Sequence, residues 1–192
     1  MSESNTPHKH HICPWWMGYF LASPLRRWMQ NPAKIISPYV HEGMTVLEPG
    51  PGMGFFTLEI AERVGFSGRV IVVDVQQKML DVLMRKAKKK GLADRIDARL
   101  VTDDGTGTDD LAGKVDLVWA FAVVHELPDM NLFFREAAAA LKTGGKLYLA
   151  EPSGHVNPDA WAKTIASAKL AGLAPESEIT IPRSRTALLA KS

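Results

Sequence analysis

Two kinds of hydrophobic pattern alternate along most of the chain. Short runs of β-branched and other apolar residues are typical of buried strands, and apolar residues recurring every three or four positions are typical of amphipathic helices. From Met44 onward the first pattern predicts strands at 44–48, 69–74, 97–102, 115–121 and 146–151. The second pattern predicts helices at 55–64, 76–90, 130–142 and 158–171.

The end of the chain changes pattern. Two short strands are expected at 177–182 and 185–191, joined by the basic turn Arg183-Ser184-Arg185. Strands that alternate with helices indicate a parallel sheet with right-handed crossovers, and a closing hairpin adds an antiparallel strand. We therefore expect an α/β protein with a Rossmann-like, doubly wound sheet of seven strands, mostly parallel with one antiparallel strand near the C-terminus.

A glycine-rich loop follows the first predicted strand. Glycines at 50, 52 and 54 permit a sharp turn and let a ligand approach the backbone closely. Their spacing differs from the G-x-G-x-x-G of dinucleotide-binding proteins, which argues against an NAD(P) oxidoreductase. Glu48 precedes the loop, and its carboxylate would repel a pyrophosphate but would accept hydrogen bonds from an ammonium or from hydroxyl groups.

Acidic residues also end the second and third predicted strands. Asp74 is placed to bind ribose hydroxyls, as an acid at this position does in related α/β sheets. The alternative is that Asp74 only caps the helix predicted at 76–90. Asp103 and Asp104 stand at the tip of the third strand.

Three segments together suggest a family. The order acid-x-Gly-x-Gly-x-Gly over 48–54 resembles motif I of the class I S-adenosylmethionine (SAM) dependent methyltransferases. The segment 115–127 resembles their motif IV, and 141–152 resembles their Leu-x-Pro-Gly-Gly turn and fifth strand, with Thr143 in place of proline. The resemblance covers about residues 34–191. It is strongest to small-molecule enzymes such as the quinone-biosynthesis C-methyltransferases.

The resemblance implies that SAM is the cofactor and S-adenosylhomocysteine the product. It places Asp104 at the adenine amino group, with Asp103 as the competing choice. Met79 would cover the adenine, although ordinary core packing explains this residue equally well. The full set of cofactor contacts that the resemblance implies is Glu48, Gly50, Gly52, Gly54, Asp74, Val75, Met79, Asp104, Gly105, Ala120 and Phe121.

A general base is needed only if the methyl acceptor must lose a proton. His125, at the exit of the fourth predicted strand, is the best-placed candidate for this catalytic role. Glu126, Glu151 and His155 stand behind it as further candidates. The alternative is that His125 is a hydrogen-bonded structural residue. The acceptor itself is expected to be a small molecule and is not identified.

Residues 1–40 differ from the predicted methyltransferase domain at 41–192. Aromatic residues concentrate in 12–40, among them Trp15, Trp16 and Trp28. We expect this segment to form a lid and acceptor wall, because it is the only sizeable apolar segment outside the alternating pattern. Packing on a sheet edge is one alternative, and contact with a membrane surface through the segment 15–28 is the other.

Composition narrows the picture further. A net charge of +2 gives no reason to expect nucleic acid as a partner, and a single cysteine, Cys13, excludes an intrachain disulfide. Neither a membrane-spanning run nor a secretory signal is evident, so the expected location is the cytoplasm. The cluster of His8, His10, His11 and Cys13 suits zinc in its chemistry but lacks a second rigid ligand pair, so no metal is expected.

Other functions remain open. An RNA or protein methyltransferase of the same fold is disfavoured because Ala120 to Val123 replaces the Asn-Pro-Pro-Tyr type of tetrapeptide. Arsenite as acceptor is disfavoured because it calls for several thiols. A SAM-binding protein without catalytic activity is a further alternative, since the residues expected to bind the acceptor are not evident in the sequence.

Overall fold

The computed structural model describes residues 31–102, 105–177 and 179–192. Its helices are α3 (Pro32–Ile36), α4 (Thr57–Arg63), α5 (Gln77–Lys89), α6 (Met130–Ala140) and α7 (Pro158–Leu170), with short 3-10 helices η1 (Ala93–Arg95), η2 (Asp109–Leu111) and η3 (Val124–Glu126). Its strands are β1 (Thr45–Pro49), β2 (Arg69–Asp74), β3 (Ile96–Leu100), β4 (Val115–Phe121), β5 (Leu141–Pro152), β6 (Leu173–Ser177) and β7 (Ser184–Lys191).

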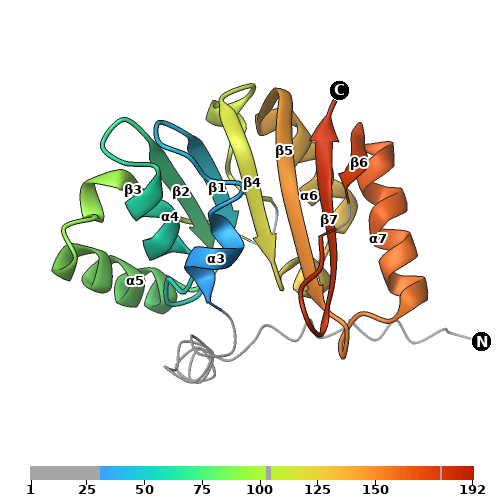
Figure 1. Ribbon diagram of the computed structural model, residues 1–192, viewed down its shortest axis with the longest axis horizontal. Helices are drawn as coiled ribbons and strands as arrows, with labels where there is room; N and C mark the ends of the chain where they lie inside the picture. Colours follow the sequence, from blue (N-terminus) through green and yellow to red (C-terminus); the bar gives the residue numbers. More distant parts are fainter. Residues whose placement is uncertain (1–30, 103–104, 178) are drawn as a thin grey trace, which may run out of the picture.

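The strands form one sheet in the order β3-β2-β1-β4-β5-β7-β6 (Figure 1). Strands β1 to β5 pair in parallel, whereas β7 lies between β5 and β6 and is antiparallel to both. The predicted fold class is therefore confirmed, including the antiparallel strand near the C-terminus. The strand order reverses between β1 and β4, and ligands of such sheets bind beyond the carboxyl ends of the strands at that point.

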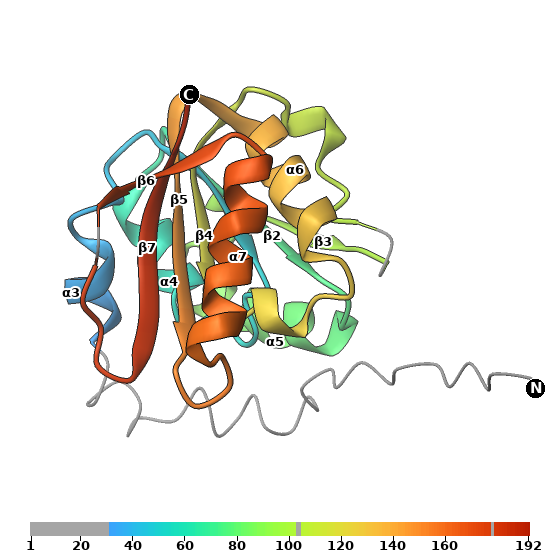
Figure 2. The same cartoon turned by 90° about the vertical axis from the view of Figure 1, so that its right-hand side faces the viewer.

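Each strand sends alternate side chains to the two faces of the sheet. Val46, Trp119 and Tyr148 face α3, α4 and α5, whereas their neighbours Leu47, Val118 and Leu149 face α6 and α7. Figure 2 shows the sheet from its β6 edge, with α3 on one side and α6 and α7 on the other. Successive residues of a strand face opposite sides of the sheet, and helices cover both sides. Nearly every residue of the central strands is therefore buried, which explains their unbroken apolar runs.

Three strand boundaries differ from the prediction. The prediction of a strand at 177–182 is wrong, because β6 spans Leu173–Ser177 and pairs Leu173 with Lys191 of β7. Ile181 is buried in the core without joining the ladder. The third strand ends at Leu100, opposite the last residue of β2, and the fifth begins early at Leu141, across from Val115, with a register irregularity before Lys146.

Residues 31–40 are the only described part of the expected N-terminal extension. Ile36 and Val40 are buried in the same core cluster as α4 and α5. Tyr39 packs edge-on against Tyr148, with the ring centroids 5.0 Å apart. This end of the segment is thus part of the domain core, and the remainder of the proposed lid lies outside the described residues.

Candidate active site

The glycine-rich loop lies between β1 and α4, beside the point where the strand order reverses. Gly50 adopts φ +61°, and an added Cβ would lie 2.8 Å from Val123 Cγ2, so a side chain is excluded there both by conformation and by space. Gly52 adopts φ +53° with no atom within 4 Å of a built Cβ, which leaves open space beside its backbone. Gly54 instead lies against Leu83 of α5, so its contact is with the core.

Glu48 is a buried carboxylate at the start of this loop. Its residue is 3% exposed, and burial raises its pKa to about 8. The nearby Thr57 hydroxyl acts in the opposite direction, yet neither Thr57 Oγ1 nor Glu48 Oε2 has a hydrogen-bond partner of normal geometry among the described residues. A buried acid with an orphaned oxygen is costly. It is explained if a ligand brings a cation or a donor to Glu48.

Asp74 ends β2 next to the same loop and is 9% exposed. Its Oδ1 accepts a hydrogen bond from the Gln76 amide at 2.9 Å. Burial raises the pKa of Asp74 to about 6, the amides of Gln76, Val75 and Gly52 oppose the shift, and the charge of Glu126 adds to it. The N-cap of α5 is Gln76, so Asp74 fixes the turn between strand and helix rather than capping the helix.

The other predicted cofactor residues are distributed around this edge. Val75 follows Asp74 and is 39% exposed, an apolar surface next to the acid. Met79 is buried in the first turn of α5. The Ala120 side chain is buried in the core, and the partly buried Phe121 packs on Phe56 with the ring centroids 4.5 Å apart. Asp104, together with its competitor Asp103, lies outside the described residues.

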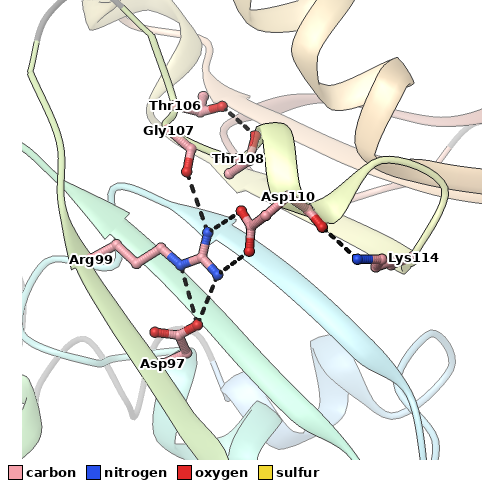
Figure 3. Close-up of polar contacts among 7 residues, drawn as sticks. All are labelled: Asp97, Arg99, Thr106, Gly107, Thr108, Asp110 and Lys114. Atoms are coloured by element: carbon pink, nitrogen blue, oxygen red, sulfur yellow. Dashed lines mark hydrogen bonds and ion pairs between the residues drawn. The ribbon is translucent and has the colours of Figure 1, made fainter.

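The segment after β3 is fixed by an arginine that the sequence analysis did not single out (Figure 3). Arg99 donates to both carboxylate oxygens of Asp110, at 2.7 and 2.9 Å, and also to Asp97 and to the Gly107 carbonyl. These hydrogen bonds, led by those to Asp110, raise the pKa of Arg99 further above its usual range. The sequence signal that could have revealed this ion pair is Asp97-x-Arg99, since residues two apart on a strand lie on the same face of the sheet.

Gly105 belongs to this same segment. An added Cβ there would lie 2.6 Å from Oε1 of Glu136 on α6, and the other oxygen of Glu136 accepts from the Thr106 amide at 2.8 Å. Glu136 therefore holds the Thr106 amide, and Arg99 holds Gly107 and Asp110, in the segment that follows the predicted adenine contacts.

Lys86 is a second residue whose role the sequence did not reveal. It belongs to a basic run at the end of α5, yet its Nζ donates to the Met53 carbonyl in the glycine-rich loop at 2.9 Å. Burial lowers the pKa of Lys86. Its contact ties α5 to the loop, a link between residues far apart in sequence.

His125 and Glu151 meet at the ends of β4 and β5. The Nδ1 atom of His125 contacts Oε2 of Glu151, whose residue is 1% exposed. The other oxygen of Glu151 accepts from the amides of Val123 and Val124 at 3.2 and 2.8 Å. The hydrogen bond to Glu151 is the main cause that raises the pKa of His125, with the charges of Glu151 and Glu126 acting in the same direction and burial opposing it.

The opposite nitrogen of His125 points toward a second histidine. Nε2 of His125 lies 3.4 Å from Nδ1 of His155 and 3.8 Å from a carboxylate oxygen of Glu126. The His125 side chain is 19% exposed. Just before it, Ala122 adopts φ +56°, a conformation that is uncommon for a residue with a side chain. Such strain is characteristic of functional sites. The structure thus brings together all four acid–base candidates named from the sequence.

A doubly wound sheet with a glycine loop and acids at its switch point defines the class of Rossmann-like methyltransferases. The methyltransferase domain family matches residues 46–145, just over half of this chain. The chain therefore belongs to that family, whose class I members depend on SAM.

Relatives and solved structures agree with this assignment. The chain is 30% identical over 121 residues to an arsenite methyltransferase of Aquipseudomonas alcaligenes, covering 61% of this chain and 35% of that protein. It is 27% identical over 143 residues to a ubiquinone/menaquinone biosynthesis C-methyltransferase of Rhizobium meliloti, covering 71% and 55%. The chain thus spans between a third and about half of these relatives' lengths.

A solved structure shows the same fold over nearly all of the chain. The crystal structure of a SAM-dependent methyltransferase from Aquifex aeolicus matches with a TM-score of 0.80 and 22% identity, covering 92% of this chain and 97% of that one. At this identity the match shows the fold alone. The expected similarity to quinone-biosynthesis methyltransferases is confirmed by the sequence relatives.

The described residues give two further findings. No helix among them is long and apolar enough to cross a membrane. They also contain no group of three or more His, Cys, Asp or Glu side chains arranged to hold a metal ion. The cluster of His8, His10, His11 and Cys13 lies outside this part of the chain.

Proposed function

We propose that this protein transfers a methyl group from SAM to a small-molecule acceptor and releases S-adenosylhomocysteine. The observation that carries the proposal is the buried, orphaned carboxylate oxygen of Glu48, in the strand that leads into the loop with the open backbone of Gly52. SAM carries an ammonium that satisfies such an oxygen, whereas a dinucleotide brings a pyrophosphate to the same place. The residues at this edge therefore fit SAM.

Each end of SAM has a suitable set of residues. Glu48 would bind the ammonium, and the loop from Gly50 to Gly52 would lie along the backbone of the methionyl group. Asp74 would accept hydrogen bonds from the ribose hydroxyls, and Val75, Met79 and Gly105 would border the adenine, with Asp104 toward its amino group. When bound, SAM supplies an electrophilic methyl group on a sulfonium, so the protein contributes mainly binding, orientation and exclusion of water.

His125 is the proposed general base. With Nδ1 held by Glu151, its Nε2 is the atom that would take a proton from the acceptor. Glu151 is then a positioning residue, because it fixes the ring and favours the protonated form that results. Only the neutral imidazole accepts a proton, so transfer should increase with pH through the raised pKa of His125. Glu151→Gln should move this limb of the pH profile to lower pH.

Calorimetry with SAM, S-adenosylhomocysteine and NAD tests the proposal. We expect both adenosyl compounds to bind and NAD not to bind. Binding of NAD alone would overturn the assignment. Binding of SAM without turnover over a broad panel of acceptors would favour the non-catalytic alternative, and turnover only with RNA or protein would favour the macromolecular one.

The identity of the acceptor and the location of the protein are also matters of proposal. Small-molecule relatives support a small acceptor, and a single cysteine disfavours arsenite even though one relative is an arsenite methyltransferase.

We retain the cytoplasm as the expected location. We also retain residues 12–30 of the expected lid, since 31–40 belong to the core. Deletion of 1–30 should abolish transfer while SAM affinity changes by less than about tenfold, because the cofactor loop lies beyond the deletion.

A further inference from the structure

The basic turn Arg183-Ser184-Arg185 precedes β7 and lies at the same end of the sheet as the histidine pair. In the antiparallel ladder Arg185 is directly opposite Glu151, the residue that holds His125. Residues opposite each other in such a ladder point to the same face, with Cβ atoms about 4.5–5.5 Å apart. Arg185 therefore lies on the face and at the level of the sheet where His125 is anchored.

Hydrogen bonds tie this turn to the loop that carries His155. Ser153 donates to the Arg183 carbonyl from both its amide and its hydroxyl, each at 2.9 Å. Arg185 Nε donates to the Val156 carbonyl at 2.7 Å. These contacts lie on either side of His155, and Figures 1 and 2 show the two loops side by side at this end of the sheet. His155 in turn lies 3.4 Å from His125.

The charges of the two arginines are not compensated within the described part of the chain. The Arg183 side chain is exposed and makes no hydrogen bond or ion pair there. The guanidinium of Arg185 is partly buried, yet only its Nε has a partner, and that partner is a neutral carbonyl. The acids nearest to the histidines are Glu126 and Glu151, and Glu151 is already occupied by two amides and His125.

The backbone of the turn is constrained as well. Arg183 adopts φ +60°, and together with Ala122 it is one of the two non-glycine residues of the described ranges with a positive φ. This conformation is unfavourable for a residue with a side chain and is found where surrounding structure or function requires it. The two strained residues therefore stand at the exit of β4 and the entrance of β7, on either side of β5.

We infer that Arg183, Arg185 and His155 form a subsite for an anionic group on the methyl acceptor, a carboxylate or a phosphate. Guanidinium groups bind such anions through paired hydrogen bonds, and the free terminal nitrogens of Arg185 are available for this. The acceptor would then carry its acid at the β5–β7 side and its methylated atom near His125. The inference rests on the proposed function, since it names the substrate class of that same site.

The test uses matched probes with the full chain saturated with S-adenosylhomocysteine. Calorimetry compares 4-hydroxybenzoate with its neutral analogue 4-hydroxybenzamide in the wild type, in Arg183→Gln, in Arg185→Gln and in the double variant. Arg85→Gln is the control, because Arg85 is exposed on α5 and makes no hydrogen bond or ion pair with another described residue. Arg183→Gln also removes an exposed, unbonded side chain, so a folding defect does not explain its effect.

We expect 4-hydroxybenzoate to bind at least about tenfold more tightly than the amide, which corresponds to about 1.4 kcal/mol. In the double variant, the affinities for 4-hydroxybenzoate and 4-hydroxybenzamide should differ by less than about threefold. In Arg85→Gln the wild-type preference for 4-hydroxybenzoate should persist. Tighter binding of phenyl phosphate would identify the acid as a phosphate.

Two outcomes would contradict the inference, and they are distinguishable from a failure of the proposed function. If S-adenosylhomocysteine binds but the wild type shows no preference for an anionic probe, the subsite is wrong and the proposed function stands. The same holds if the preference survives in the double variant. If S-adenosylhomocysteine itself does not bind, the proposed function fails and the subsite fails with it.

Discussion

The ends of β1 and β2 and the ends of β4, β5 and β7 carry two differently built halves of the site. In the first half, backbone around Gly50 and Gly52 and two buried acids, Glu48 and Asp74, shape a place for a ligand. In the second half, His125, Glu151 and two arginines come from three separate strand ends. The first half is the proposed cofactor side of the site, and the second half is the proposed acceptor side.

The electrostatics of the two halves differ in the same way. Burial raises the pKa of Glu48 and Asp74 because it removes water from their carboxylates. The pKa of His125 is raised because an anion accompanies it. Burial thus favours the protonated form of the two acids in the first half, and an anion favours the protonated form of His125 in the second. Each half should consequently respond differently to mutation and pH.

The largest expected effect is in the acceptor half. His125→Ala should lower kcat by about 10²–10⁴, the usual contribution of a general base, with S-adenosylhomocysteine affinity changed by less than about threefold. Release of S-adenosylhomocysteine with any acceptor that supports turnover provides the measurement. His41→Ala, in the turn that precedes β1 at the amino end of that strand, is the matched control. Equal losses of kcat and of cofactor affinity would instead indicate a structural histidine.

The next effect concerns stability in the cofactor half. Because the folded pKa of Glu48 is about 8 against 4.5 for a free carboxyl, the native state holds a proton that the unfolded chain releases between these values. Stability without ligand should therefore fall as pH rises from about 5 to about 8.5, by at most roughly 5 kcal/mol. Urea unfolding at both pH values measures it.

Glu48→Gln should reduce this pH dependence, and the part that remains belongs to Asp74 and His125, whose pKa values are also raised. Bound S-adenosylhomocysteine should reduce it in the wild type by supplying a cation. An unchanged pH dependence in Glu48→Gln would show that Glu48 is not the group responsible.

A smaller effect is expected for the second acid of the cofactor half. Asp74→Ala should weaken SAM binding by about 1–3 kcal/mol, the range for a hydrogen bond that involves a charged group. Calorimetry provides the measurement, with Asp94→Ala as the control because Asp94 lies in η1, away from the carboxyl ends of the strands. A silent Asp74→Ala would mean that Asp74 serves only the turn at Gln76.

The smallest effect is expected for the loop clamp beside the cofactor half. Arg99→Gln should weaken SAM binding about two- to fivefold, because partly exposed ion pairs contribute little and the loop is also held by Glu136. The loss should lie in the cofactor affinity and not in kcat. Lys146→Gln, which breaks an exposed pair with Glu176, is the control. A change in kcat alone would place Arg99 in the acceptor half instead.

The sequence alone determined the fold class and the elements that surround the cofactor half. Strand and helix periodicities, the spacing of Gly50, Gly52 and Gly54, and the acids Glu48 and Asp74 are local signals, since each depends on residues adjacent in the chain. The family assignment follows from the same segments and is confirmed. The sequence also named His125, Glu151 and His155, but only as separate candidates.

Only the tertiary structure decided how distant residues combine. The pairing of His125 with Glu151, the contact of Arg99 with Asp110, and the register of Arg185 opposite Glu151 all depend on the packing of strands that are far apart in sequence. The misplaced strand at 177–182 has the same origin, because Leu173 pairs with Lys191 across a loop that no local pattern reveals. Strand pairing is a long-range choice, and hydrophobic periodicity contains no information about which partner a strand selects.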